Sequence, residues 1–443
     1  MSTSNRVVSP ARWVPTAYLS EGIPFAMAIW VTGSMFSSLG HSDSEVALVT
    51  GSIGIAWSLK PLWAAFLDMF KTKKFFVLAM EILMAGLLVL MGLALKLPNY
   101  FALIAGLLWV FAFASATQDI CVDGVYITAL DKAGQATWIG AQGAFWNCGR
   151  AFGQGLILSV AGMLIAYGVG KHTSWTLALF LSAGVMVVLA IYHYFVLPTG
   201  TASRRPKDAA EVVSTFVDAV KAFFQKKAIW GMLIFVFLYR TGEGFLLVEA
   251  PLFMQAAVIK GGLGLTLQQK GALDGAVGTI VSVLGGLAGG MFVAKMGLKR
   301  SLLFLAICLN VPHLCYVILS QAVTPTAPLP LPLIYLLVCV EKFGYNFGFV
   351  GNMLYMMQQI APGKYKMTHY AFATSLMNLV LVPTQSVSGK LADWMGYRHF
   401  FIFVLVASIP SIIAAWKAPF PNPPDIEEEG SGTAERSVQV APA

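Results

Sequence analysis

The sequence predicts an all-α membrane protein with twelve transmembrane helices, divided into two halves of six. Hydrophobic residues make up 57% of the chain and charged residues 11%, whereas a soluble domain carries about 25% charged residues. Apolar runs of about 20 residues, the length that spans a bilayer, recur between short polar breaks. Only helices and closed barrels satisfy the backbone in lipid, and barrel strands are shorter with alternating polarity, so the runs indicate helices.

The apolar runs define twelve expected spans in chain order. They cover residues 13–38, 45–66, 75–95, 101–129, 137–166, 174–197, 229–256, 268–294, 301–321, 331–360, 366–391 and 400–418. An even number of spans places both termini on one side of the membrane. Loops on that side contain fifteen Lys and Arg residues against four on the other side, and such an excess marks the cytoplasm. We therefore interpret the net charge of +8 as an orientation signal, with no nucleic-acid partner.

The longest loop divides the chain near its middle. Residues 1–197 form the expected N-terminal six-helix bundle, residues 198–228 a cytoplasmic central loop, and residues 229–418 the C-terminal six-helix bundle. Within the loop, residues 209–224 alternate apolar and charged side chains at helical spacing, which favours a helix along the membrane surface. Residues 419–443 are polar and rich in Pro, and we expect them to form a disordered cytoplasmic tail.

The two halves share motifs at equivalent places. Tyr18-Leu-Ser-Glu-Gly opens the first span, and Tyr239-Arg-Thr-Gly-Glu-Gly occupies the equivalent place in the seventh, while basic turns close the second and eighth spans. Two halves of like orientation are the plan of the major facilitator fold, whose substrate and coupling sites lie between the halves. We expect charged residues of the basic turns to gate the path, or else only to mark the cytoplasmic side. They are Lys60, Asp68, Lys295 and Arg300.

Two carboxylates follow a wholly apolar run in the fourth span. Asp119 and Asp123 are four residues apart, so a helix places them on one face. An ionised Asp at the centre of a bilayer helix costs about 2.5–3.5 kcal/mol, which predicts that this face meets a water-filled cavity or a partner. We expect the two acids to couple transport to protons. The alternative is that their face meets a cytoplasmic vestibule near the helix end.

The second half contains matching acids. Glu243 and Glu341 lie in the seventh and tenth spans, and we expect them to act in proton coupling there. Arg240 lies three residues before Glu243, so a static salt bridge is an equally open interpretation. In the fifth span, Arg150 is a candidate counter-ion for the aspartates of the fourth span, or a clamp for an anionic group on a substrate.

Other polar and aromatic residues in the spans give weaker signals. Glu81 lies within about two turns of a span end, which predicts contact with the membrane interface. His193 and His369 are single histidines without metal-ligand spacing, and we expect no metal or cofactor site. Trp30 and Trp146 are candidates for stacking on sugar rings, although lipid contact and core packing are the commoner roles.

Three stretches together resemble the AmpG-type muropeptide permeases of the major facilitator superfamily, within its peptide and acetyl-coenzyme-A transporter group. The stretches are Glu21-Gly-Ile-Pro with Trp57-Ser-Leu-Lys-Pro-Leu-Trp, then Ser115-Ala-Thr-Gln-Asp through Asp123, and Leu238-Tyr-Arg-Thr-Gly-Glu. The resemblance covers nearly the whole chain. The chain departs from it in the fifth span, where the family's Tyr-Arg-Leu-Gly pattern is replaced by Trp146-Asn-Cys-Gly.

The resemblance implies a proton-coupled secondary transporter in the bacterial inner membrane, not an enzyme. Its expected cargo is N-acetylglucosaminyl-1,6-anhydro-N-acetylmuramic acid and its peptides, which move into the cytoplasm and feed peptidoglycan recycling. The expected partners are this solute, protons and the bilayer, and we expect a monomer. The residues that we expect to contact the substrate are Glu21, Gln118, Tyr126, Asn147, Arg150, Tyr239, Arg240 and His369.

Three alternatives remain open from the sequence. The nearest is a related carrier for another solute, such as a sugar oligomer, a siderophore or acetyl-coenzyme A. The second is a membrane-embedded transferase in which Asp119 and Asp123 hold a metal ion, against which stand the internal repeat and the lack of a clustered third acidic ligand. The third is a sensor that moves no solute.

Overall fold

The computed structural model describes residues 8–41, 45, 49–50, 52–69, 72–200, 209–265, 269–270, 272–324 and 328–422. The regular elements in these residues are all helical, which confirms the predicted all-α class. Within this part of the chain, nine helices are long and apolar enough to cross a membrane. The protein is therefore a multi-pass membrane protein.

The first group of helices covers most of the predicted spans, but the described part of the second predicted span, 45–66, contains short helices with a break at Lys60. It comprises α1 (Pro10–Ala26), η1 (Met27–Val31), α2 (Thr32–Ser38), α4 (Ile55–Ser58), α5 (Pro61–Met69), α6 (Lys73–Ala94), α7 (Tyr100–Ala129), α8 (Lys132–Ala151), η2 (Phe152–Ile157), α9 (Leu158–Ala166) and α10 (Lys171–Val196). Side-chain caps fix two of the starts. Thr72 accepts from the amide of Phe75 at the start of α6, and Asp131 accepts from the amide of Gly134 at the start of α8. Both caps therefore fall at polar breaks between apolar runs.

The second group covers the rest of the apolar sequence. It comprises α12 (Ile229–Leu238), α13 (Thr241–Gln255), η3 (Val258–Lys260), η4 (Ala272–Val277), α15 (Gly278–Met296), α16 (Leu298–Asn310), η5 (Val311–His313), α17 (Leu314–Ala322), α18 (Leu331–Tyr355), η6 (Met356–Ile360), α19 (Lys366–Leu379), α20 (Leu381–Ala407) and α21 (Ile409–Trp416). Helix α20 contains a kink at Gly396, whose φ of 71° favours glycine. The kink falls between the last two predicted spans.

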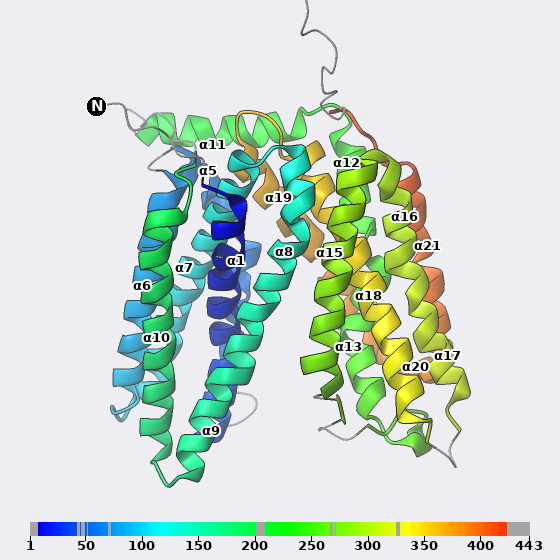
Figure 1. Ribbon diagram of the computed structural model, residues 1–443, viewed down its shortest axis with the longest axis horizontal. Coiled ribbons are helices and arrows are strands. Elements are labelled where there is room, and N and C mark those ends of the chain that lie inside the picture. Colours follow the sequence, from blue (N-terminus) through cyan, green and yellow to red (C-terminus); the bar gives the residue numbers. More distant parts are fainter. Residues whose placement is uncertain are drawn as a thin grey trace, which may run out of the picture.

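The two groups lie side by side in Figure 1, with α1 and α6–α10 on the left and α12, α13, α15–α18, α20 and α21 on the right. Glycines permit the closest approach between them. A Cβ added to Gly140 of α8 would lie 2.5 Å from the Cα of Leu287 of α15, so no side chain fits at this crossing. Further along the same helices, a Cβ on Gly290 would lie 2.9 Å from the carbonyl oxygen of Ala136. The helices α8 and α15 therefore pack backbone to backbone.

The predicted helix of the central loop is present as α11 (Ala209–Phe224) and contacts both groups. It lies across the upper end of the bundle in Figure 1, and we call this end the α11 end. The ring of Phe216 stacks on Phe66 of α5, with centroids 5.9 Å apart. Nε2 of His369 in α19 lies 3.1 Å from the carbonyl oxygen of Ala219. The helix thus joins the first group to α19.

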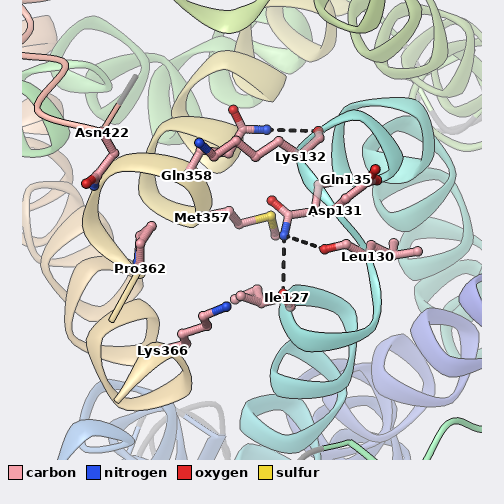
Figure 2. A pocket seen from close by; sticks show the side chains of 10 residues that line it. All are labelled: Ile127, Leu130, Asp131, Lys132, Gln135, Met357, Gln358, Pro362, Lys366 and Asn422. Carbon is pink, nitrogen blue, oxygen red and sulfur yellow. Dashed lines mark hydrogen bonds between the residues drawn. The ribbon is translucent and has the colours of Figure 1, made fainter. Parts of the chain in front are cut away.

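A pocket of about 470 Å³ lies between the two groups at the α11 end (Figure 2). Its walls come from the connection between α7 and α8 on one side and from η6 and the start of α19 on the other. Gln358 of η6 donates to the carbonyl oxygen of Lys132 across the groups, at 3.1 Å. Gln135 donates to the carbonyl oxygens of Ile127 and Leu130 at the end of α7. The bond from Gln358 therefore links the two groups, while Gln135 fixes the α7–α8 connection on one side of the pocket.

The start of the expected tail packs against the second group. Tyr355 donates to the carbonyl oxygen of Pro419 at 2.5 Å, and its ring contacts Phe420. Gln359 and Asn422 exchange hydrogen bonds through both side chains and backbone. Residues 423–443, the remainder of the segment for which we predict disorder, lie outside the described part of the chain.

Candidate functional site

Five side chains from three parts of the first group meet in its interior, and we call them the acid cluster. They are Tyr18, Glu21, Lys60, Asp119 and Asp123. Nζ of Lys60 forms an ion pair with Oδ2 of Asp119. The hydroxyl of Tyr18 donates to Oδ1 of Asp123 at 3.0 Å. The two aspartates, one helical turn apart on α7, thus both find polar partners, as their spacing predicts.

The third carboxyl group comes from α1. Glu21 lies beside Asp119, and the exposed fraction of Glu21 is 8%. Asp119 and Asp123 are each 7% exposed, so solvent reaches the cluster only slightly. Ionising all three carboxyl groups beside one lysine would bury two uncompensated charges, which is very costly. The geometry therefore suits a cluster that holds at least one exchangeable proton.

A close helix contact places α8 beside these acids. A Cβ on Gly22 of α1 would lie 2.2 Å from the carbonyl oxygen of Trp146, and one on Gly149 would lie 2.3 Å from the carbonyl oxygen of Leu19. Because both positions are glycine, the backbones of α1 and α8 approach closely. Gln142, two turns before Arg150 on α8, places its amide 3.5 Å from Oδ1 of Asp123.

Next to the acid cluster lies a group of large rings, which we call the aromatic cluster. The ring of Phe25 contacts Trp30, Trp57 and Trp146, with centroids 5.0–5.5 Å apart. The guanidinium of Arg150 lies over the rings of Trp30 and Trp146, at 5.6 and 5.7 Å. All five side chains are half-buried. Aromatic faces beside a cation suit a ligand that combines an apolar ring face with an anionic group.

The second group contains its own charged site around Arg240. Nε of Arg240 donates to Glu243 at 2.6 Å, and a second guanidinium nitrogen contacts the same carboxylate. The hydroxyl of Tyr345 donates to Glu243 at 2.7 Å, and the guanidinium also reaches Asn378 of α19 at 3.3 Å. The Arg240–Glu243 pair, an open alternative from the sequence, is therefore present and bidentate. Glu341 lies one turn before Tyr345 on α18, half-buried.

Several residues expected to contact substrate are used inside the fold. Tyr126 and Tyr239 are 0% exposed and donate to the carbonyl oxygens of Gln135 and Gly348. His369 lies under α11, as described above. Gln118 is also 0% exposed. These four side chains are therefore buried in the fold and do not line a solvent-accessible surface of the acid cluster or the aromatic cluster.

The remaining predicted residues fall in different places. Asn147 is half-buried on α8 and donates to the carbonyl oxygen of Gly143. Among the residues expected to act as gates, Lys60 lies in the acid cluster, whereas Lys295 and Arg300 are exposed at the junction of α15 and α16. The side chain of Asp68 lies outside the described part of the structure.

One polar contact was not foreseen. Glu81 is 0% exposed and pairs with His193 of α10, which is also 0% exposed. The expectation that Glu81 meets the membrane interface is therefore wrong. The two residues lie 112 positions apart, so no local spacing signals their contact. Within the described residues, no group of three or more His, Cys, Asp or Glu side chains is arranged to hold a metal ion.

Comparisons with known proteins extend this picture. A family model described as Major Facilitator Superfamily matches residues 16–382. The anhydromuropeptide permease of Escherichia coli K12 is 23% identical over 405 residues, which cover 89% of this chain and 76% of the relative. The putative transporter AmpG 4 of Rickettsia felis is 23% identical over 415 residues, covering 88% and 92%. These similarities confirm the resemblance to AmpG-type permeases, and they indicate a transporter rather than an enzyme.

Proposed function

Because the chain belongs to the Major Facilitator Superfamily, we propose that it is a proton-coupled secondary transporter that imports cell-wall-derived amino-sugar solutes by alternating access. One relative is named for anhydromuropeptide, and others are named as AmpG transporters. Both names favour N-acetylglucosaminyl-1,6-anhydro-N-acetylmuramic acid and its peptides as the cargo.

The observation that carries proton coupling is the buried ion pair of Lys60 and Asp119 with two further carboxyl groups beside it. A proton that reaches Asp119 neutralises it and leaves Lys60 to pair with Glu21 or Asp123, whose charges also act on Lys60. The cluster can therefore exist in two arrangements that differ by one proton and one ion-pair partner. A conformational change that favours one arrangement is thereby linked to proton binding.

The aromatic cluster supplies the substrate side of the proposal. A pyranose ring presents an apolar face that stacks on Trp or Phe, and the muramyl lactyl group or its peptide carries a carboxylate for Arg150. Because Gly22 and Gly149 bring α1 and α8 together, bound solute at Arg150 lies close to Glu21. Solute binding and proton binding then act on the same pair of helices. In the second group, the bidentate pair of Arg240 and Glu243 is the proposed counterpart.

We further propose the complete topology. Twelve spans form two six-helix repeats, both termini and α11 face the cytoplasm, and the protein works as a monomer in the inner membrane. The cross-group contacts at the α11 end then hold the cytoplasmic side closed. This arrangement receives solute from the opposite side, which suits import.

Uptake by purified protein in proteoliposomes tests the proposal. The panel contains labelled N-acetylglucosaminyl-anhydromuramic acid with and without its peptide, a sugar oligomer, a siderophore and acetyl-coenzyme A, each with an inward proton gradient. Accumulation of the anhydromuramyl solutes alone supports the proposal. Accumulation of another member assigns a different cargo to the same class of carrier, and no accumulation of any solute contradicts the transport function.

A further inference from the structure

A second polar cluster lies inside the first group, where α1, α6, α7 and α10 meet. Nδ1 of His193 lies 2.7 Å from Oε1 of Glu81, and both side chains are 0% exposed. The same oxygen of Glu81 accepts from the amide of Gln118 at 3.1 Å. Gln118 also donates to the hydroxyl oxygen of Ser20 at 3.0 Å. We call these four side chains the buried network.

The buried network links four helices. Nδ1 of His193 on α10 and the amide of Gln118 on α7 converge on one oxygen of Glu81 on α6. The same amide reaches Ser20 on α1. The network is therefore a continuous chain of contacts from α10 through α6 and α7 to α1.

The buried network joins the helices that carry the acids. Gln118 immediately precedes Asp119 on α7, and Ser20 immediately precedes Glu21 on α1. The bond from Gln118 to Ser20 thus ties α7 to α1 at the level where the two carboxyl groups approach each other. The side-chain amide of Gln118 also donates to Glu81, and His193 contacts the same oxygen of Glu81.

We propose that Glu81 and His193 are positioning residues for proton coupling, which hold Gln118 so that α7 and α1 keep Asp119 and Glu21 within reach of one shared proton. This inference rests on the proposed function. Two carboxyl groups that share a site hold one proton more tightly than either alone, and the effect depends on their separation. Loosening the buried network therefore releases the shared proton at lower pH.

Other charged and titratable groups lie on the helices packed against the pair. They include Tyr18 and Glu21 on α1, Asp119, Asp123 and Tyr126 on α7, Lys73 at the start of α6, and Tyr192 on α10, whose hydroxyl donates to the carbonyl oxygen of Arg12. Asp119 and Glu21 are the two carboxyl groups proposed to share the proton. A carboxyl signal that disappears in Asp119→Asn is therefore the signal of the shared proton.

The test is an infrared pH titration of the purified protein, which follows protonated carboxyl groups without any transport. The native protein should show a carboxyl band that is lost in Asp119→Asn. The variant Glu81→Leu/His193→Leu replaces both members of the buried pair by apolar side chains of similar size, a change that folded proteins tolerate. Its band should titrate about one pH unit lower, because Gln118 has lost its acceptor. Glu81→Gln keeps an acceptor for Gln118 and should shift less.

His313→Leu is the matched control, because His313 is a 1% exposed histidine of the second group bonded to Ser408. It should leave the band unchanged. A folded double-leucine variant with a native titration would overturn the inference, as would an equal shift in His313→Leu. Proton-driven uptake by the same proteins separates the two proposals. If no solute is taken up but the band shifts, the positioning role stands and the proposed function fails.

Discussion

Lys60 and Asp119 form an ion pair in the interior of the first helix group, with side chains 8% and 10% exposed. The sequence places Lys60 at the end of the second span, where we expected it to act at a gate. The structure instead brings it to the centre of the acid cluster. A buried ion pair loses its charge balance when only one member changes its protonation state. Protonation of Asp119 must therefore be accompanied by a new partner for Lys60, and this exchange is the basis of the proposed coupling.

The ion pair predicts a specific pattern of stability. Asp119→Leu leaves Lys60 buried without its partner, and we expect a loss of about 3 kcal/mol, the low end for a broken buried pair because Glu21 and Asp123 are adjacent. Lys60→Met combined with Asp119→Leu should recover most of that loss, because apolar side chains fill the same volume. Thermal unfolding in detergent measures both effects. A double variant less stable than Asp119→Leu contradicts the assigned pairing.

The close approach of α1 and α8 predicts an effect of one added methyl group. Gly22→Ala places a Cβ 2.2 Å from the carbonyl oxygen of Trp146, so the helices must separate at a cost of about 1–3 kcal/mol. We expect lower thermal stability and weaker uptake, because the acid and aromatic clusters move apart. Gly143→Ala on α8 is the control, since nothing lies within 4 Å of its added Cβ. Equal effects of the two substitutions would argue against this packing role.

The proposed contact between the Arg150 guanidinium and a solute carboxylate predicts how uptake depends on the charge of the solute. A hydrogen bond to a charged group contributes about 1.5–3 kcal/mol, so Arg150→Gln should raise KM for an anionic solute roughly 10- to 100-fold. An analogue whose carboxylates are converted to amides should show little change between the native protein and the variant. Initial uptake rates over a range of solute concentrations give both values. A similar rise in KM for both solutes would remove Arg150 from carboxylate binding.

Lys226, just after α11, gives a pH-dependent probe of the α11 end. It donates to the carbonyl oxygen of Pro362, and burial lowers its pKa to about 8. The usual lysine pKa is about 10.4. A form of the protein in which the α11 end is open and Lys226 is in solvent therefore binds more protons than the closed form between these two pKa values. The closed arrangement should therefore become more stable as pH rises from about 8 to 10, since the cost of burying the charged amine disappears.

Acylation of Lys226 measures this shift directly. Only the neutral amine reacts, so its rate in the closed arrangement should be half-maximal near pH 8. Peptide mass spectrometry follows the modification, and the exposed Lys227 beside it serves as an internal reference for reagent decay. A midpoint for Lys226 near pH 10 would show that the amine is not held as the structure has it.

Hydropathy and charge were enough to predict the all-α class, the extent of several helices and the positions of the acids along them. The fourth predicted span, 101–129, matches α7 (Tyr100–Ala129), because apolar length and the polar break at Asp131 are local properties. The π-helical segments were not predicted. One of them, η2 (Phe152–Ile157), continues α8 without any change in composition, so the sequence carries no local signal for it.

Side-chain partners were harder to predict than positions. We considered Arg150 as the counter-ion for Asp119, but the ion-pair partner is Lys60, 59 positions away, and Arg150 lies over two tryptophan rings. Which face of one helix meets another depends on packing between segments distant in the chain, and periodicity does not report it. The pair of Arg240 and Glu243 was foreseen because both lie within one turn of one helix.

Proton movement that accompanies solute entry distinguishes a proton symporter from an uncoupled carrier. Proteoliposomes without an imposed gradient, loaded with a pH-sensitive dye, receive external N-acetylglucosaminyl-anhydromuramic acid. If the acid cluster couples solute to protons, the lumen acidifies as the solute enters. Asp119→Asn should abolish the acidification while still exchanging labelled for unlabelled solute. Solute entry without acidification in the native protein, or native acidification in Asp119→Asn, would contradict the proposed coupling.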